Sequence, residues 1–164
     1  MPSVNLPQFP ILGGCQCGRI RYSLKAAPVV FYLCHCTECQ KQSSSAFGES
    51  VKVRREDIEI DGEPGEYRTV ADSGNAKRCE FCPKCGTRLF HGRWPEAETF
   101  NLKGGTLDDA AWLVPAGHIW TRSKQAFYAI GPGEIVYPAD PDYAVLTAKW
   151  REMIGLPITS SPPR

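Results

Sequence analysis

Residues 34–39 read CHCTEC, which places three of the chain's eight cysteines within one short stretch. Two more cysteines occur upstream in GGCQCG (residues 13–18), and three occur downstream in CEFCPKC (residues 79–85). Cysteines this close in sequence rarely reach disulfide geometry with each other, and clustered thiolates are typical zinc ligands. The clusters therefore predict a fold built around zinc, with disulfides as the alternative reading in an oxidising compartment.

The size and charge of the chain favour an ordinary globular protein. It has 164 residues, 42% of them hydrophobic, and 19 basic against 18 acidic side chains give a net charge of +1. This balance provides no general attraction to phosphate polymers, so we expect no nucleic-acid partner. The longest apolar run, residues 26–34, is interrupted by Pro28 and is shorter than the roughly 20 residues of a membrane span. No signal peptide is recognised at the N-terminus, and we expect a cytoplasmic protein without a membrane partner.

Periodicity predicts a mainly β fold. In GRIRYSLKA (residues 18–26), Ile20, Tyr22 and Leu24 alternate with polar residues, as in a half-buried strand. We expect further strands at 29–33, 50–62, 66–71, 87–94, 99–107, 116–121 and 126–130. The polar segment after Cys39 is expected to contain at most one helical turn, and only residues 143–155 show the spacing of a helix.

The two outer clusters can supply the four ligands of a closed zinc site. Cys82 and Cys85 have the spacing of a zinc knuckle, and Cys15 and Cys17 form a shorter hook. A glycine follows each pair, as expected for a tight turn around the sulfurs. Four ligands make a structural site that contributes folding free energy directly.

The middle cluster is then left with three thiols, namely Cys34, Cys36 and Cys39. Three protein ligands and one free position are typical of a catalytic zinc. Two alternatives remain open at this point. Cys79 or a histidine could complete a second structural site, or the three could be free, redox-active thiols.

Three histidines are candidates for moving a proton at such a centre: His35, His91 and His118. His35 lies between two of the proposed ligands, His91 follows an apolar run, and His118 belongs to AGHIWT (residues 116–121). Each can also be a structural residue, and we expect His118 to contact the substrate.

The motifs resemble the glutathione-dependent formaldehyde-activating enzyme family, which has an Mss4-like fold and is related to centromere protein V. The resemblance is carried by GGCQCGRIRY (13–22), CHCTECQK (34–41) with SSAF (44–47), FCPKCGTRLF (81–90) and PAGHIWTRSK (115–124). It implies small antiparallel sheets organised around zinc, with one short C-terminal helix. We expect an irregular arm at residues 1–12, the zinc-binding β domain at 13–138, and at 139–164 an extension whose helix packs on the same domain.

The resemblance also implies ligands and an activity. It makes Cys15, Cys17, Cys82 and Cys85 the structural zinc ligands and Cys34, Cys36 and Cys39 the catalytic zinc ligands. The family members are carbon–sulfur lyases that reversibly join formaldehyde to glutathione, so the implied cofactor is Zn²⁺ and the implied partner is a small thiol or its adduct. A different class of function is a non-catalytic module, either a zinc-stabilised thiol carrier or an Mss4-like binding protein.

The chain departs from the family's usual pattern at four positions. Gln40 stands where an arginine usually follows the cysteine triplet, and Ser44 stands where a glycine is common. Cys79 occupies the place of another arginine, and Phe127 that of a tryptophan. These positions lie near the expected pocket and leave the zinc ligands unchanged.

Overall fold

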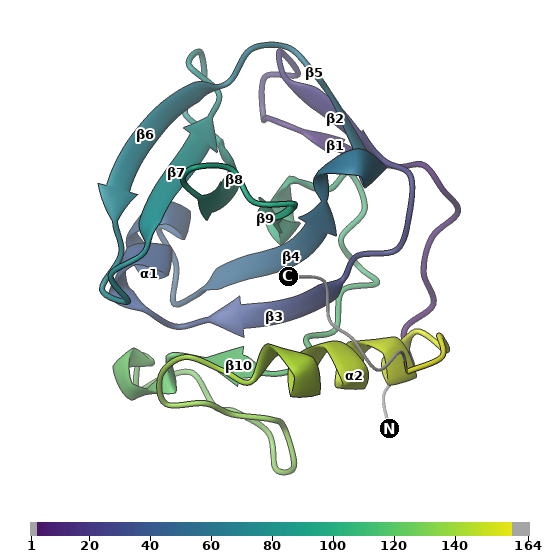
Figure 1. Ribbon diagram of the computed structural model, residues 1–164, viewed down its shortest axis with the longest axis vertical. Coiled ribbons are helices and arrows are strands. Elements are labelled where there is room, and N and C mark those ends of the chain that lie inside the picture. The colour runs from purple at the N-terminus through teal and green to yellow at the C-terminus, as the bar shows by residue number, and fades with distance from the viewer. Residues whose placement is uncertain (1–2, 159–164) are drawn as a thin grey trace.

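The computed structural model describes residues 3–158, and Figure 1 shows how the elements are arranged. The strands are β1 (Ile11–Gly14), β2 (Arg21–Leu24), β3 (Val30–Cys34), β4 (Gly48–Arg54), β5 (Ile58–Asp61), β6 (Gly65–Val70), β7 (Ala76–Phe81), β8 (Arg88–Arg93), β9 (Thr99–Lys103) and β10 (His118–Ile119). The helices are α1 (Thr37–Ser43) and α2 (Tyr143–Met153), with short 3-10 turns at Arg55–Asp57, Gly104–Thr106 and Thr121–Ser123. The prediction of a mainly β fold is confirmed.

The strands form two sheets. The larger has seven strands in the order β10-β3-β4-β9-β8-β7-β6, and the smaller has three in the order β1-β2-β5. All pairs are antiparallel except β10 with β3. The strongly curved large sheet winds around α1, and the small sheet lies beside it (Figure 1).

Cross-strand pairing separates the side chains of the large sheet into two faces. Phe31, Val51 and Leu102 pair in one row across β3, β4 and β9, and all three are buried. Ser50 and Lys103, each next to a member of this row, pair with each other. Since side chains alternate along a strand, these two lie on the opposite, more polar face.

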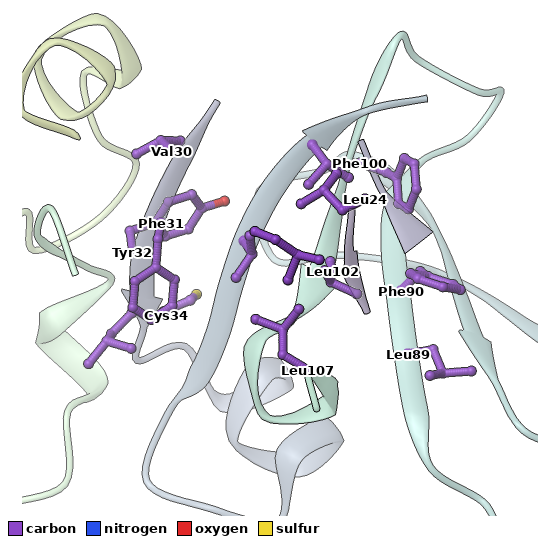
Figure 2. Close-up of a cluster of buried hydrophobic side chains, with 14 of the residues drawn as sticks. Leu24, Val30, Phe31, Tyr32, Cys34, Leu89, Phe90, Phe100, Leu102 and Leu107 are labelled. Carbon is purple, nitrogen blue, oxygen red and sulfur yellow. The ribbon is translucent and has the colours of Figure 1, made fainter. Parts of the chain in front are cut away.

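The apolar face of the large sheet forms the core together with the small sheet. Leu24 of β2 belongs to the same buried cluster as Phe31, Phe90, Phe100 and Leu102 of the large sheet, and Figure 2 shows these side chains. The predicted alternation in β2 is also observed, because Tyr22 and Leu24 are buried while their neighbours in the strand are partly exposed.

Helix α2 is observed where helical spacing was expected. Asp142 caps its N-terminus by accepting hydrogen bonds from two backbone amides, and Leu146, Trp150 and Met153 are buried. Val145, in contrast, is 44% exposed. The buried stripe packs on β3, where the ring of Trp150 meets that of Phe31 edge-on at 6.3 Å.

Several local predictions differ from the structure. The segment after Cys36 forms the two-turn helix α1, because the Cys36 sulfur accepts a hydrogen bond from the Cys39 amide and caps the helix. Residues 50–62 form two strands in different sheets, separated by the 3-10 turn Arg55–Asp57. Residues 126–130 form no strand. Within residues 3–158, no helix is long and apolar enough to cross a membrane.

Candidate metal centre

The two outer cysteine pairs meet in space to form a four-cysteine cluster of Cys15, Cys17, Cys82 and Cys85. Their sulfur atoms all lie within 4.8 Å of one another. Two of the distances are 3.6 Å, between the Cys15 and Cys17 sulfurs, and 3.7 Å, between the Cys17 and Cys82 sulfurs. A tetrahedral zinc with bonds of about 2.3 Å to each sulfur needs sulfurs about 3.8 Å apart. The donor type and the spacing both fit a structural zinc.

Each half of the four-cysteine cluster is a tight turn that ends in a glycine. Gly18 and Gly86 have φ angles of +76° and +77°, a region that favours glycine. The Gly18 amide donates to the Cys15 carbonyl, and the Gly86 amide donates to the Cys82 carbonyl. The first turn follows β1 and the second joins β7 to β8, so the cluster ties the two sheets together.

The middle cysteines form a separate group, which we call the thiol trio: Cys34, Cys36 and Cys39. The Cys34 and Cys36 sulfurs are 3.5 Å apart, and all three lie within 4.8 Å of one another. Cys34 ends β3, Cys36 caps α1 and Cys39 lies in its first turns, so the strand-to-helix junction brings them together. Hydrogen bonds from Cys34 first, and then from Cys39, lower the pKa of Cys36. The trio can hold a soft divalent ion with three thiolates.

A cavity of about 460 Å³ opens beside the thiol trio, on the polar face of the large sheet. All three cysteines of the trio contribute to its wall. Lys77 of β7 and Arg93 of β8 also line it and are directly opposite each other across the two strands. Aromatic walls come from Tyr32, Trp120 and Tyr143. A small polar molecule can therefore lie with one end against the trio.

His35 and His118 do not line this cavity. The His35 Nε2 atom is 3.0 Å from His118 Nδ1, and His118 Nε2 is 2.6 Å from a carboxylate oxygen of Glu134. Burial, followed by the nearby charge of His118, lowers the pKa of His35 to about 4, so the ring is neutral at pH 7. These two side-chain contacts fix His35 in place, and with it the backbone between Cys34 and Cys36.

His91 is the histidine that lines the cavity. Its side chain lies on β8 opposite Cys79 of β7, and it is 6% exposed. Burial is the main cause that holds the pKa of His91 well below its usual value, and the neighbouring Lys103 and Lys77 act in the same direction. The ring is therefore neutral at pH 7.

Comparison with known proteins identifies the family. The family model described as glutathione-dependent formaldehyde-activating enzyme matches residues 10–123, which is more than half of the chain. The chain belongs to this family. A crystal structure of a Rhodobacter sphaeroides protein is similar at 16% identity, over 77% of this chain and 99% of that chain, with a TM-score of 0.49. No curated protein matches the chain.

Cys79, the cysteine that could complete a second structural site, lies outside the thiol trio. The group of sulfurs within 4.8 Å contains Cys34, Cys36 and Cys39 but not Cys79, among residues 3–158. Cys79 is buried on β7, and burial raises its pKa. A role for Cys79 as a fourth ligand stays a prediction that would require its sulfur to approach the other three.

Gln40, Ser44 and Phe127, which we expected near the pocket, do not line the cavity. The Gln40 side-chain amide donates to the backbone carbonyls of His35 and Ser123, at 2.8 and 2.9 Å. Ser44 ends α1 with a φ of 52°, in the region where glycine is favoured. Phe127 is 78% exposed.

Sequence reasoning missed the polar residues that surround the trio. Lys77, Arg93 and Ser50 line the cavity, and Lys103 is buried near it. A signal for one of them was present, because Thr99, Asn101 and Lys103 alternate with apolar residues along β9. Alternation of this kind indicates a second, polar face of the sheet, but it does not show which residues meet there.

Proposed function

We propose that the protein is a zinc-dependent carbon–sulfur lyase that reversibly joins a small thiol to an aldehyde. The observation that carries the proposal is the thiol trio: three converging sulfurs form part of the wall of a cavity. Three protein ligands leave one position for a substrate, whereas four would close the site. The description of the family names glutathione and formaldehyde, and an S-hydroxymethyl thiol is the adduct that we expect.

Zinc bound by the trio would supply a fourth coordination position and would favour the deprotonated form of a substrate thiol. The protein's own task is then to position the trio and the substrate. Helix α1 and the end of β3 hold the three sulfurs together, and the His35–His118–Glu134 contacts fix His35 within that junction.

Lys77 and Arg93 are suited to bind a carboxylate of the thiol substrate. They face each other across β7 and β8, they line the cavity, and neither forms an ion pair within residues 3–158. An arginine offers two parallel N–H groups to a carboxylate. This pair of basic residues favours the binding of a thiol that carries carboxylates, such as glutathione, over the binding of an uncharged thiol.

We assign proton transfer at the aldehyde oxygen to His91. It lines the cavity beside the trio, whereas His35 and His118 do not. Its neutral ring can either give a proton or accept one, depending on the direction of the reaction. This assignment replaces our expectation that His118 contacts the substrate with a positioning role for His118.

The same site would also serve a thiol carrier that accelerates no reaction, and a closed zinc site would serve a binding module. Cobalt-substituted protein separates these possibilities when glutathione is added and the visible spectrum is followed. The lyase and the carrier predict a spectral change, and the lyase alone predicts turnover of formaldehyde with glutathione. An unchanged spectrum would contradict the proposal.

We also propose a reducing compartment, such as the cytoplasm, for this function. All eight cysteines are free thiols in the structure, including those of the four-cysteine cluster and of the thiol trio. Free thiols persist where glutathione and thioredoxin keep them reduced. Metal binding at both clusters requires the same condition, since a disulfide removes two ligands.

A further inference from the structure

Among the described residues, several buried polar atoms have no hydrogen-bond partner, and three of them belong to neighbouring strands of the large sheet: Ser50 Oγ, His91 Nδ1 and Lys103 Nζ. Their residues are 1%, 6% and 7% exposed. Ser50 and Lys103 are paired across β4 and β9, and His91 is paired with Asn101, two residues before Lys103. The three therefore lie close together on the polar face of the large sheet, on the side that carries the trio.

Of the three groups, the Lys103 ammonium is the most costly to bury without a partner. A buried ammonium group without a counter-charge is strongly unfavourable. No carboxylate forms an ion pair with Lys103 in the part of the chain that the structure describes, although Glu49 and Lys103 both line a second, smaller cavity. Within residues 3–158, the fold therefore keeps a buried amine at this place without an ion-pair partner.

The thiol trio lies on the same side of the sheet as Lys103, because Ser50, the cross-strand partner of Lys103, lines the cavity together with all three cysteines. Burial lowers the pKa of the Lys103 amine, and the cysteine sulfurs oppose this shift, with Cys39 first and then Cys79, Cys34 and Cys36. The whole trio thus acts on this one lysine. When the three are thiolates, they provide the negative charge that the buried ammonium group lacks.

Lys103 changes the net charge of a metal centre formed at the trio. Three thiolates around a divalent ion sum to −1, and an incoming fourth thiolate makes the centre −2. Such a charge is costly in a buried site unless a cation stands nearby. With Lys103 included, the sum is 0 before the thiolate enters and −1 afterwards.

We propose that Lys103 is a positioning residue that balances the charge of the fourth sulfur ligand, and so makes the trio prefer thiolates to neutral ligands. This inference rests on the proposed function, because it requires a metal that accepts a ligand from the cavity. It names the chemical class that the open position selects, which is anionic sulfur. It assigns no contact between Lys103 and the substrate.

The test compares an anionic ligand with a neutral one on cobalt-loaded full-length protein. The probes are 2-mercaptoethanol, which binds as a thiolate, and imidazole, which binds uncharged, and both are titrated at a fixed pH with the cobalt spectrum as the signal. Lys103→Met should weaken the binding of 2-mercaptoethanol on the order of tenfold, because one nearby positive charge is lost. Binding of imidazole should change less than about twofold.

Three further variants make the result specific. Lys103→Arg keeps the charge and should retain most of the thiol affinity, whereas Lys103→Gln removes it and should behave like Lys103→Met, which covers the case in which the methionine variant fails to fold. Lys52→Met is the matched control: Lys52 lines the cavity, but the charges that act on its pKa are those of Arg93 and Lys77, not those of the trio. It should leave both affinities unchanged.

The outcomes also separate this inference from the proposed function. If cobalt-loaded wild-type protein binds no thiol, the proposed function fails and the role of Lys103 fails with it. If the wild type binds the thiol but the charge-removing variants weaken both probes equally, or weaken neither, Lys103 is only a structural residue. A loss confined to the thiol in Lys103→Met and Lys103→Gln supports the proposal.

Discussion

Gln40 shows how a single side chain can hold the candidate site in place. Its amide group donates to the carbonyls of His35 and Ser123, and its oxygen accepts a hydrogen bond from Gln125 at 3.0 Å. These contacts fasten the first turns of α1, which carry Cys39, to the 3-10 turn that follows β10.

Replacing Gln40 tests this anchor. Gln40→Ala should lower the free energy of unfolding by about 1–3 kcal/mol, because three hydrogen bonds are lost and two backbone carbonyls lose a donor. Urea unfolding of the zinc-loaded protein measures the effect. Gln125→Ala, which removes one of the three bonds, should cost clearly less, and equal losses in the two variants would contradict the anchoring role.

The buried ring of His91 should make stability depend on pH. Its pKa in the folded protein lies well below the value of about 6.5 expected in the unfolded chain. As the pH falls below about 6.5, the unfolded chain therefore binds a proton that the folded protein does not, and stability decreases.

Urea unfolding at pH 7.5 and pH 5.5 measures this contribution from His91. Between these values the wild type should lose about 1 kcal/mol more than a His91→Gln variant, in which the titrating ring is absent. Zinc is kept at the same concentration throughout, so that loss of metal affects both proteins alike. A pH dependence that is the same in both would exclude His91 as its source.

Helix α1 is the element that decides whether the trio forms, and its end is strained. Ser44 has a φ of 52°, and its amide closes the helix by donating to the carbonyl of Gln40. A residue with a Cβ atom in this conformation costs roughly 1–2 kcal/mol relative to the right-handed region, a cost that glycine avoids.

Ser44→Gly should therefore raise the free energy of unfolding by about 0.5–1 kcal/mol, since the gain is partly offset by the freedom of glycine in the unfolded chain. Thermal or urea unfolding gives the value. Ser45→Gly is the control, because Ser45 has no positive φ and the change should be neutral or destabilising. If both variants shift stability in the same direction, strain at Ser44 is not the cause.

At the scale of the elements, the sequence predicts what local periodicity controls. Alternation identifies β2 through Tyr22 and Leu24, and the apolar stripe identifies α2 through Leu146 and Trp150. It fails at α1, because that helix has one buried residue, Cys39, and begins with a cysteine as its cap. Neither feature belongs to the usual signals of a helix.

The candidate site was predictable to the extent that its ligands are close in sequence. Spacing predicts that the four-cysteine cluster and the thiol trio are separate groups, and the structure groups the sulfurs in the same way. The surrounding charges come from strands that are distant in the chain. Lys77 and Arg93 meet at the cavity through the order of strands in the large sheet, which the sequence does not specify.

For the whole molecule, the two cysteine groups should contribute unequally to stability. The four-cysteine cluster joins segments about 65 to 70 residues apart in the chain and links the two sheets, whereas the trio lies within one strand-to-helix junction. Closing a long loop restricts the unfolded chain more than closing a short one.

Replacing one ligand in each group tests this difference. Cys85→Ala and Cys36→Ala should each lose one zinc, but Cys85→Ala should lower the midpoint of thermal unfolding more. Zinc content and thermal unfolding are measured on protein kept in reductant. A larger effect of Cys36→Ala would mean that the trio, and not the four-cysteine cluster, holds the fold together.

The central claim is that the metal at the thiol trio has a position free for a substrate thiol. Zinc X-ray absorption measures this most directly, because it counts the sulfurs bound to zinc before and after glutathione is added to the fully loaded protein. Averaged over one closed and one open site, the count should rise from about 3.5 to about 4 sulfurs per zinc. A count of about 4 without glutathione, or no increase when it is added, would contradict the claim.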